Sequence, residues 1–401
     1  MSFRLGIDMT VYILSLIASI LLILACPPFE IPLFIFIFWI PFSLILYMES
    51  SLLKKLFYVF MFGMTLMSII CFGTSLSIVA YCIMIIIWPF SLVLYTVIVN
   101  KFMVKTGSLF TPLFLTGAWI LMEFLLACIG MPIYVGILSV PLLQYMQIAS
   151  VFGILGVSFF IVLPQAYIGY ALKLIIIDKK LMISIGAVLI SILIIISNTI
   201  WGKYQVGQIN VRLTKEILPE INVCTLQTAF STKDYDLSNL SYFYSKAVCD
   251  ICFNKFFTCK NKQHYLIIWP EEPDAFYNVD VKPLYENIVN ISNKLDAYCL
   301  LGSHKLDTIG NIYNSMFLFS PNRKNYQTYH KKQPLPFYED YICAGNNETL
   351  IEVDSFLIGT LLCNESIFAG PSRELVKKDA NMLVYSTNEH YLNGSVLSLL
   401  F

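Results

Sequence analysis

The chain has 401 residues, of which 57% are hydrophobic and 13% are charged, with 26 basic and 26 acidic side chains. Soluble proteins carry about 25% charged residues, so this composition excludes an ordinary soluble enzyme and also a disordered chain. The balanced charge predicts no nucleic-acid partner, because such a partner requires a basic surface.

The hydrophobic residues are concentrated in the first half of the chain. Residues 1–201 contain eight Lys or Arg and five Asp or Glu, whereas residues 202–401 contain 18 and 21. This change in composition predicts two domains. We expect a multi-span α-helical membrane domain over residues 1–201 and a water-soluble α/β domain over residues 202–401.

The first half contains seven apolar runs separated by short loops. They cover residues 9–25, 31–48, 56–73, 80–98, 109–128, 149–172 and 181–200. A helix needs about 20 apolar residues to cross the hydrocarbon core of a bilayer. We therefore predict seven transmembrane helices.

Basic residues of this half lie before the first run and then in every second loop. They precede the first run and follow the second, fourth and sixth runs: Arg4, Lys54, Lys55, Lys101, Lys105, Lys173, Lys179 and Lys180. The loops near 26–30, 74–79 and 129–148 contain no Lys or Arg. Because positive charge gathers on the cytoplasmic side, we expect a cytoplasmic N-terminus. Seven crossings then place the soluble half outside, which in a bacterium is the periplasmic side of the inner membrane.

One acidic residue, Glu123, lies inside a predicted span. An acid at membrane depth is costly and usually faces a cavity or a partner. Two interpretations stay open from the sequence, a functional group or a structural hydrogen bond to a neighbouring helix.

The second half alternates β-rich runs with helical stretches. Strands are predicted at 221–227, 265–270, 298–303, 312–320, 350–363 and 382–387, and helices at 236–260, 282–296 and 371–379. This alternation predicts a layered α/β domain, in which strand ends are the usual place for chemistry.

Three predicted strands lead into reactive side chains. Glu271 follows the strand at 265–270, Lys331 follows the strand at 312–320 after a polar turn, and Cys363 follows the segment 356–362. A thiolate is a nucleophile, and a carboxylate can take the thiol proton and return it to a leaving group. A lysine can favour the thiolate and stabilise an oxyanion. Such a set also arises by chance, so spacing alone does not decide.

Three sequence blocks resemble the nitrilase, or carbon–nitrogen hydrolase, superfamily. Residues 266–271 (LIIWPE) resemble its WPE motif, and residues 329–339 (YHKKQPLPFYE) resemble the block around its lysine. Residues 361–368 (LLCNESIF) resemble its nucleophile turn. The apolar half, with ACPPF at 25–29, Trp119 with Glu123, and the stretch 131–160, resembles one branch, the apolipoprotein N-acyltransferases.

The resemblance implies a fold and residue roles. The soluble domain is expected to be an αββα sandwich. Glu271 corresponds to the general base, Lys331 to the catalytic lysine and Cys363 to the nucleophile, with Glu339 and Glu365 as supporting acids. The family continues beyond the position of Phe401, so the resemblance also implies a domain that is incomplete at its C-terminus.

The implied activity is acyl transfer. Cys363 would take an acyl group from a membrane phospholipid, and a diacylglyceryl apolipoprotein would accept it on its N-terminal amine, without a metal or organic cofactor. The partners are therefore the lipid bilayer, a phospholipid donor and apolipoprotein acceptors. Two alternatives remain: a membrane-tethered amidase with water as acceptor, and an inactive truncated remnant.

Overall fold

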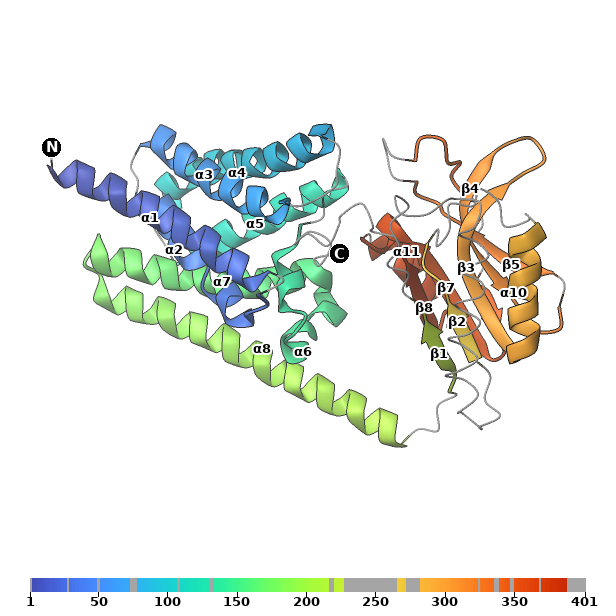
Figure 1. Ribbon diagram of the computed structural model, residues 1–401. Helices are drawn as coiled ribbons and strands as arrows, with labels where there is room; N and C mark the ends of the chain where they lie inside the picture. Colours follow the sequence, from blue (N-terminus) through green and yellow to red (C-terminus); the bar gives the residue numbers. More distant parts are fainter. Residues whose placement is uncertain are drawn as a thin grey trace. The chain divides into compact units, whose positions relative to one another are not determined.

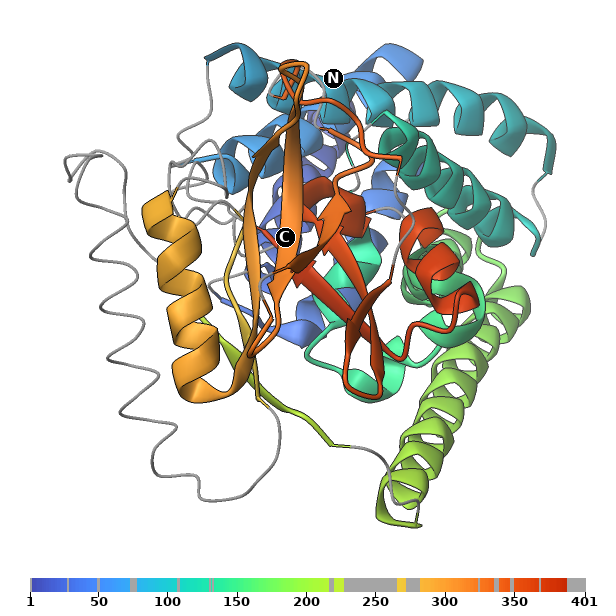
Figure 2. The same ribbon diagram turned by 90° about the vertical axis from the view of Figure 1, so that its right-hand side faces the viewer.

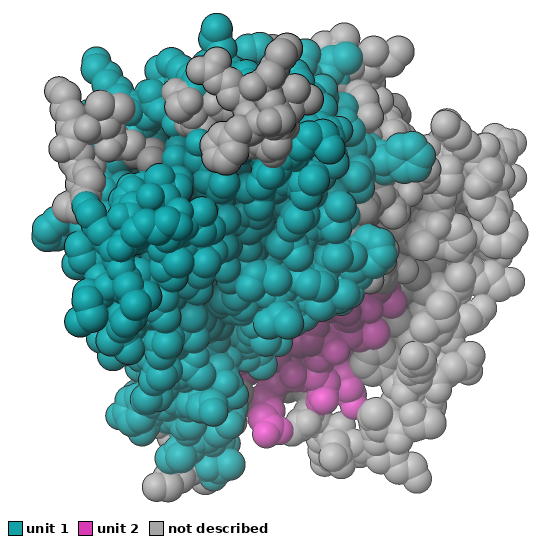
Figure 3. Space-filling view, turned by 90° about the vertical axis from the view of Figure 1, so that its left-hand side faces the viewer, with its two compact units in different colours: residues 1–216, 391–401 teal, residues 217–390 magenta. Residues whose placement is uncertain are grey.

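The computed structural model describes most of the chain. The described residues are 2–26, 29–48, 51–72, 78–106, 109–129, 131, 133–215, 220–226, 265–271, 282–323, 325–334, 339–346, 350–367 and 369–387. The chain divides into two compact units between Glu216 and Ile217, and Figure 3 colours the two units separately. The helix predicted at 236–260 lies outside the described residues.

The first unit is helical. Its elements are α1 (Ser2–Ala25), η1 (Pro32–Phe36), α2 (Trp39–Met48), α3 (Leu52–Ile70), α4 (Ile78–Thr106), α5 (Thr111–Cys128), η2 (Val135–Ser139), α6 (Leu143–Met146), α7 (Ala149–Ile176) and α8 (Leu181–Lys215). Figure 1 shows these helices in blue to green. Among the described residues, five helices are long and apolar enough to cross a membrane, namely α3, α4, α5, α7 and α8. The first two predicted runs coincide with shorter apolar stretches, Met9–Ala25 and Pro32–Met48.

The run predicted at 31–48 is not one continuous helix. It divides into the 3₁₀ helix η1 and the α-helix α2. The fully buried side chain of Gln165, on α7, bridges the break: its Oε1 accepts from Trp39 N at 2.8 Å and its Nε2 donates to Ile35 O at 2.9 Å. A polar side chain from another helix thus satisfies backbone groups that the break exposes.

Helix α8 is longer than the predicted run at 181–200. It continues to Lys215 and contains no proline, so its backbone ladder is not interrupted where the sequence becomes polar. The change in composition near residue 201 therefore falls inside this helix, whereas the compact units divide after Glu216.

Aromatic rings fill the centre of the helical unit. Trp119, on α5, is fully buried, and five rings lie within 6.5 Å of it between centroids: Phe38, Trp39, Phe42, Trp88 and Tyr95. Large rings that meet edge to face bury much apolar area and restrict one another's geometry.

Glu123 lies one helical turn after Trp119 and is fully buried. Its Oε1 accepts a hydrogen bond from Trp119 Nε1 at 2.9 Å and another from Val135 N at 3.1 Å. The neighbouring Gly136 N donates to Ser158 Oγ at 2.8 Å. The first amides of η2 are thus satisfied by side chains of α5 and α7, which favours the structural interpretation of Glu123.

The described residues of the second unit form two sheets. Its elements are β1 (Asn222–Thr225), β2 (Tyr265–Ile268), α10 (Lys282–Leu295), β3 (Ala297–Leu306), β4 (Ile312–Phe319), β5 (Tyr326–His330), β6 (Ile351–Val353), β7 (Phe356–Leu362), η3 (Cys363–Ile367), α11 (Ala369–Lys377) and β8 (Met382–Ser386). One sheet has the order β1-β2-β3-β4-β5, parallel through β3 and then antiparallel. The other has the order β6-β7-β8.

The two sheets pack face to face, and in the described part of the unit α10 lies outside one sheet and α11 outside the other. Leu266, Leu300 and Leu318 from the first sheet meet Ile358 and Val384 from the second in a shared core. On the outer side of the first sheet a second core includes residues of α10. On the other side α11 packs closely on β7: a Cβ at Gly359 would lie only 3.0 Å from the side chain of Leu375. Figures 1 and 2 show α10 and α11 on opposite sides of the two sheets. The unit is the expected αββα sandwich.

Two strand predictions need correction. The run at 350–363 is a hairpin of β6 and β7, because Asp354 in the turn has a φ of 51° and reverses the chain. Lys331 follows β5, a strand that the sequence prediction missed, rather than a turn after β4. The residues of β5, YQTYH, are mostly polar and half-buried, so they lack the apolar signal of an interior strand.

Candidate active site

The carboxyl ends of β2, β5 and β7 carry the three predicted reactive residues. The segment after β2 is held in place because Trp269 N donates to Leu300 O at 2.9 Å and Ser386 Oγ donates to Trp269 O at 3.2 Å. Glu271 follows and is 5% exposed. Tertiary contacts thus anchor the turn that carries this carboxylate, on both sides of the sandwich.

The backbone of Lys331 is fixed on both sides. Its N–H donates to Asn314 O at 2.8 Å, and its carbonyl accepts from Gly345 N at 2.7 Å. Gly345 passes so close to β5 that a Cβ there would lie 2.5 Å from His330. Glycine is required at this approach because any side chain would push Lys331 out of position.

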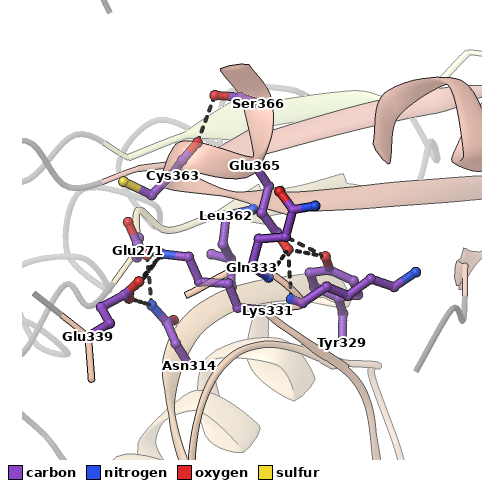
Figure 4. Close-up of polar contacts among 11 residues, drawn as sticks. Glu271, Asn314, Tyr329, Lys331, Gln333, Glu339, Leu362, Cys363, Glu365 and Ser366 are labelled. Carbon is purple, nitrogen blue, oxygen red and sulfur yellow. Dashed lines mark hydrogen bonds and ion pairs between the residues drawn. The ribbon is translucent and has the colours of Figure 1, made fainter. Parts of the chain in front are cut away.

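Lys331 lies between two carboxylates. Its Nζ is 3.2 Å from Glu271 Oε1 and 2.8 Å from Glu339 Oε2, and its side chain is 1% exposed. Asn314 Nδ2 donates to the same Glu271 oxygen at 2.8 Å and to Glu339 Oε1 at 3.0 Å. These four residues form a closed polar ring (Figure 4). Sequence analysis predicted its three charged members and missed Asn314.

The electrostatics of the ring favour a charged lysine. Burial acts to lower the pKa of Lys331, but the negative charges of Glu271 and Glu339 outweigh it and hold the pKa above its usual range. The ammonium is therefore retained at neutral pH. A buried ammonium of this kind can stabilise negative charge that develops on a substrate oxygen.

Cys363 stands at the end of β7 in a strained conformation. Its φ is 45°, in the left-handed region that a non-glycine residue adopts at a cost of about 1–3 kcal/mol. Its carbonyl accepts from Ser366 Oγ at 2.7 Å, which stabilises the turn. The side chain is partly exposed and interacts electrostatically with Glu271, Lys331 and Glu339. The sharp turn thus presents the thiol to the ring.

The resting thiol is neutral. Burial, and then the charge of Glu271, raise the pKa of Cys363 to about 12, against the opposing effects of Lys331 and of a hydrogen bond from Thr387. Because the thiolate is scarce at neutral pH, the thiol must lose its proton as it attacks. The carboxylate of Glu271 is the charged group beside it that can accept that proton.

Glu365 joins the two loops that carry Lys331 and Cys363. Its carboxylate is fully buried and accepts from Lys332 N at 2.7 Å, Gln333 N at 3.2 Å, Leu362 N at 2.9 Å and the hydroxyl of Tyr329 at 2.9 Å. Its bonds are made to these loops and to β5. The structure therefore gives this predicted supporting acid a role in positioning rather than in the ring itself.

The sequence contains a pattern that points to Asn314, namely a polar residue within an apolar strand. It lies in β4, between Tyr313 and Ser315, in a strand whose following residues are apolar and buried. Its side chain faces the same side of the sheet as Met316 and Leu318, which belong to the core between the sheets. A buried amide at such a position requires hydrogen-bond partners. The sequence indicates the need but not which partners meet it.

Comparisons with known proteins agree with this architecture. Residues 18–167 match the family model of the apolipoprotein N-acyltransferase N-terminal domain, and residues 245–397 match the model of carbon-nitrogen hydrolases. A search of curated proteins found no match. The five long apolar helices, together with the first match, indicate a membrane protein.

Several solved structures are similar to part of the chain. A Saccharomyces cerevisiae protein of branch 10 of the nitrilase superfamily is 17% identical, with a TM-score of 0.36, over 43% of this chain and 66% of that one. A Helicobacter pylori carbon-nitrogen hydrolase is 17% identical, with a TM-score of 0.34, over 42% and 59%. A Xanthomonas campestris protein of the superfamily is 15% identical, with a TM-score of 0.29, over 36% and 59%. This chain therefore spans slightly less than two thirds of each.

Proposed function

We propose that this chain, which joins an apolipoprotein N-acyltransferase N-terminal domain to a carbon-nitrogen hydrolase domain, moves an acyl group from a membrane phospholipid to the N-terminal diacylglyceryl-cysteine of apolipoproteins. The observation that carries the proposal is the thiol of Cys363 at a strained strand end beside the ring of Glu271, Lys331 and Glu339. This thiol and its base have the chemistry to form a thioester.

The first half of the reaction forms a thioester. Cys363 Sγ attacks the carbonyl carbon of a phospholipid ester while Glu271 takes the thiol proton. Lys331 Nζ stabilises the oxyanion of the tetrahedral intermediate. The intermediate then breaks its carbon–oxygen bond, Glu271 returns the proton to the leaving oxygen, and the products are a lysophospholipid and the acyl-enzyme.

The second half transfers the acyl group to an amine. The free amine of the diacylglyceryl-cysteine attacks the thioester carbonyl and forms an amide bond. Glu271 takes a proton from the attacking amine and returns it to Cys363 Sγ, which leaves as the thiol. Atoms and charges balance over the two steps, and each step uses the same base and the same ammonium.

The membrane half supports a lipid substrate. Five helices of the described residues are long and apolar enough to cross a bilayer, which would keep the enzyme in the layer that holds both proposed substrates. The alternation of Lys and Arg between the loops favours the periplasmic side of a bacterial inner membrane for the soluble unit. A periplasm-active reporter fused after Glu220 tests this side; activity of a cytoplasm-specific reporter there would contradict it.

The decisive experiment follows the acyl group. Membranes that contain the protein are incubated with a phospholipid carrying a labelled acyl chain, and the protein is examined for a label that hydroxylamine removes. Wild type should acquire the label and pass it to a diacylglyceryl-cysteine peptide. Cys363→Ala should not be labelled, whereas Cys343→Ala, a matched change at another partly exposed cysteine, should be labelled like wild type.

The competing functions give different results. An amidase would release the acyl group to water and leave the peptide amine unmodified. A protein without activity would form no thioester even with intact Cys363. Labelling that survives in Cys363→Ala would contradict the assigned nucleophile.

A further inference from the structure

Asn314 touches every other member of the ring. Its Nδ2 donates to Glu271 and Glu339, and its backbone carbonyl accepts from Lys331 N at 2.8 Å. The residue is fully buried in β4. The three sequence blocks that resemble the family do not include Asn314, which is the only uncharged side chain in the ring.

The orientation of this amide is unusual. Asn314 Oδ1 is buried and has no hydrogen-bond partner among the described residues. A buried acceptor without a partner destabilises the fold, and such a group in a native structure calls for an explanation. Rotating the amide by 180° would place Oδ1 2.8 Å from one carboxylate and 3.0 Å from the other, where it would be repelled. The two acids therefore fix the orientation of the amide, and this orientation leaves Oδ1 without a hydrogen-bond partner among the described residues.

The charges around Glu271 explain why a donor is needed. Glu271 lies near Glu339 and Cys363 and also near the ammonium of Lys331. From β3, His304 pairs with Asn314 and lies on the same face of the sheet. Because one ammonium balances only one of two close carboxylates, their mutual repulsion favours the uptake of a proton by one of them. Hydrogen bonds from the amide to both carboxylates oppose that uptake because they stabilise the charged forms.

We propose that Asn314 is a positioning residue that keeps Glu271 ionised, so that Glu271 stands ready as the base for Cys363. The inference rests on the proposed function for the base role of Glu271, but the ionisation itself is a property of the free protein. The hydrogen bonds from the Asn314 amide and from the Lys331 ammonium both end on Oε1 of Glu271.

The first assay needs no substrate. The rate at which iodoacetamide alkylates Cys363 is measured by mass spectrometry of the peptide that contains it. The measurement runs from about pH 4 to about pH 9, a range that spans the ordinary pKa values of glutamate and cysteine side chains. Ionisation of Glu271 changes the thiol reactivity and gives an inflection, which is identified because Glu271→Gln lacks it. In Asn314→Leu this inflection should move up by about one pH unit, since the carboxylate loses a stabilising hydrogen bond.

Asn314→Asp sharpens the assay, because it keeps the shape of the side chain. It adds a third acid to the ring, so the inflection should move up by more than in Asn314→Leu. Ser315→Ala is the matched control: Ser315 is the next buried polar residue on β4, and it bonds His330 Nδ1 rather than the ring. Its inflection should stay at the wild-type pH. Thermal unfolding checks that each variant is folded.

The second assay measures thioester formation from labelled phospholipid at each pH. The acidic limb of the rate should move up in the Asn314 variants by the same shift, with KM unchanged and the rate at the alkaline plateau largely recovered. An inflection that stays at the wild-type pH in folded Asn314→Leu and Asn314→Asp overturns the role of Asn314. A shifted inflection with no thioester in wild type overturns the proposed function and leaves the role of Asn314 standing.

Discussion

The two units of this protein bury polar side chains in different ways. In the helical unit Gln165 bonds to backbone groups, and Glu123 bonds to one backbone amide and one indole N–H; each lies where a helix breaks or begins. In the sandwich Glu271, Lys331 and Glu339 bond to one another and carry charge. The comparison distinguishes two roles of buried polar side chains. In one unit they satisfy hydrogen-bonding groups at helix ends, and in the other they form a cluster of charged groups at the candidate active site.

This difference predicts where charge matters. A neutral group of the same shape can replace a carboxylate that only accepts hydrogen bonds from uncharged donors. It cannot replace a member of a buried ion cluster, because the remaining charges lose their compensation.

Removal of the central ammonium should have the largest effect. Lys331→Met leaves the buried Glu271 and the partly buried Glu339 without their shared counter-ion, so unfolding should become about 3–5 kcal/mol easier and thioester formation should be lost. Thermal unfolding and the acyl-labelling assay measure both. Lys332→Met is the matched control, since its amine is partly exposed and 4.0 Å from Glu374, and it should cost less than about 1 kcal/mol. Equal losses for the two lysines would contradict the ion-cluster interpretation.

Gln165→Leu should be the most damaging of these changes in the helical unit. It leaves Trp39 N and Ile35 O without their side-chain partner in a buried site, which should cost about 2–3 kcal/mol. Unfolding in detergent, followed by tryptophan fluorescence, gives the measurement. Gln147→Leu removes an exposed bond to Leu143 O and should change stability by less than about 0.5 kcal/mol.

Glu271→Gln should separate reactivity of the thiol from catalysis. The negative charge of Glu271 raises the pKa of Cys363, so its removal lowers that pKa and increases the thiolate fraction at a fixed pH near 8. Alkylation of Cys363 should become about tenfold faster for each unit by which the pKa falls, although acyl transfer is abolished. Slower alkylation in Glu271→Gln would contradict the electrostatic contact between the two groups.

Glu123→Gln should have the smallest effect. The amide oxygen can accept the same hydrogen bonds from Trp119 Nε1 and Val135 N, so stability should change by less than about 1 kcal/mol and acyl labelling should persist. The same substitution at Glu339, in the sandwich, should impair labelling because it removes a charge from the ring. Similar losses at the two positions would remove the distinction drawn between the units.

Much of this protein could be predicted from residue patterns alone. The strands at 222–225, 265–268, 312–319 and 382–386 and the helices α10 and α11 follow the predicted ranges closely, because hydrophobic periodicity reports which face of a local segment is buried. The residues Glu271, Lys331 and Cys363 could be named because each stands beside a recognisable block of sequence. One family model matches residues 18–167 in the helical half, and another matches residues 245–397 in the α/β half.

Only the tertiary structure decided which side chains meet. The break at Trp39 depends on Gln165, which is 126 residues away, and the partners of Asn314 lie 43 and 25 residues away. The edge strand β5 is paired with β4 over its whole length, whereas its own sequence lacks the apolar pattern by which the other strands were predicted. Sequence patterns report local burial, whereas hydrogen bonds between distant segments depend on how the layers pack.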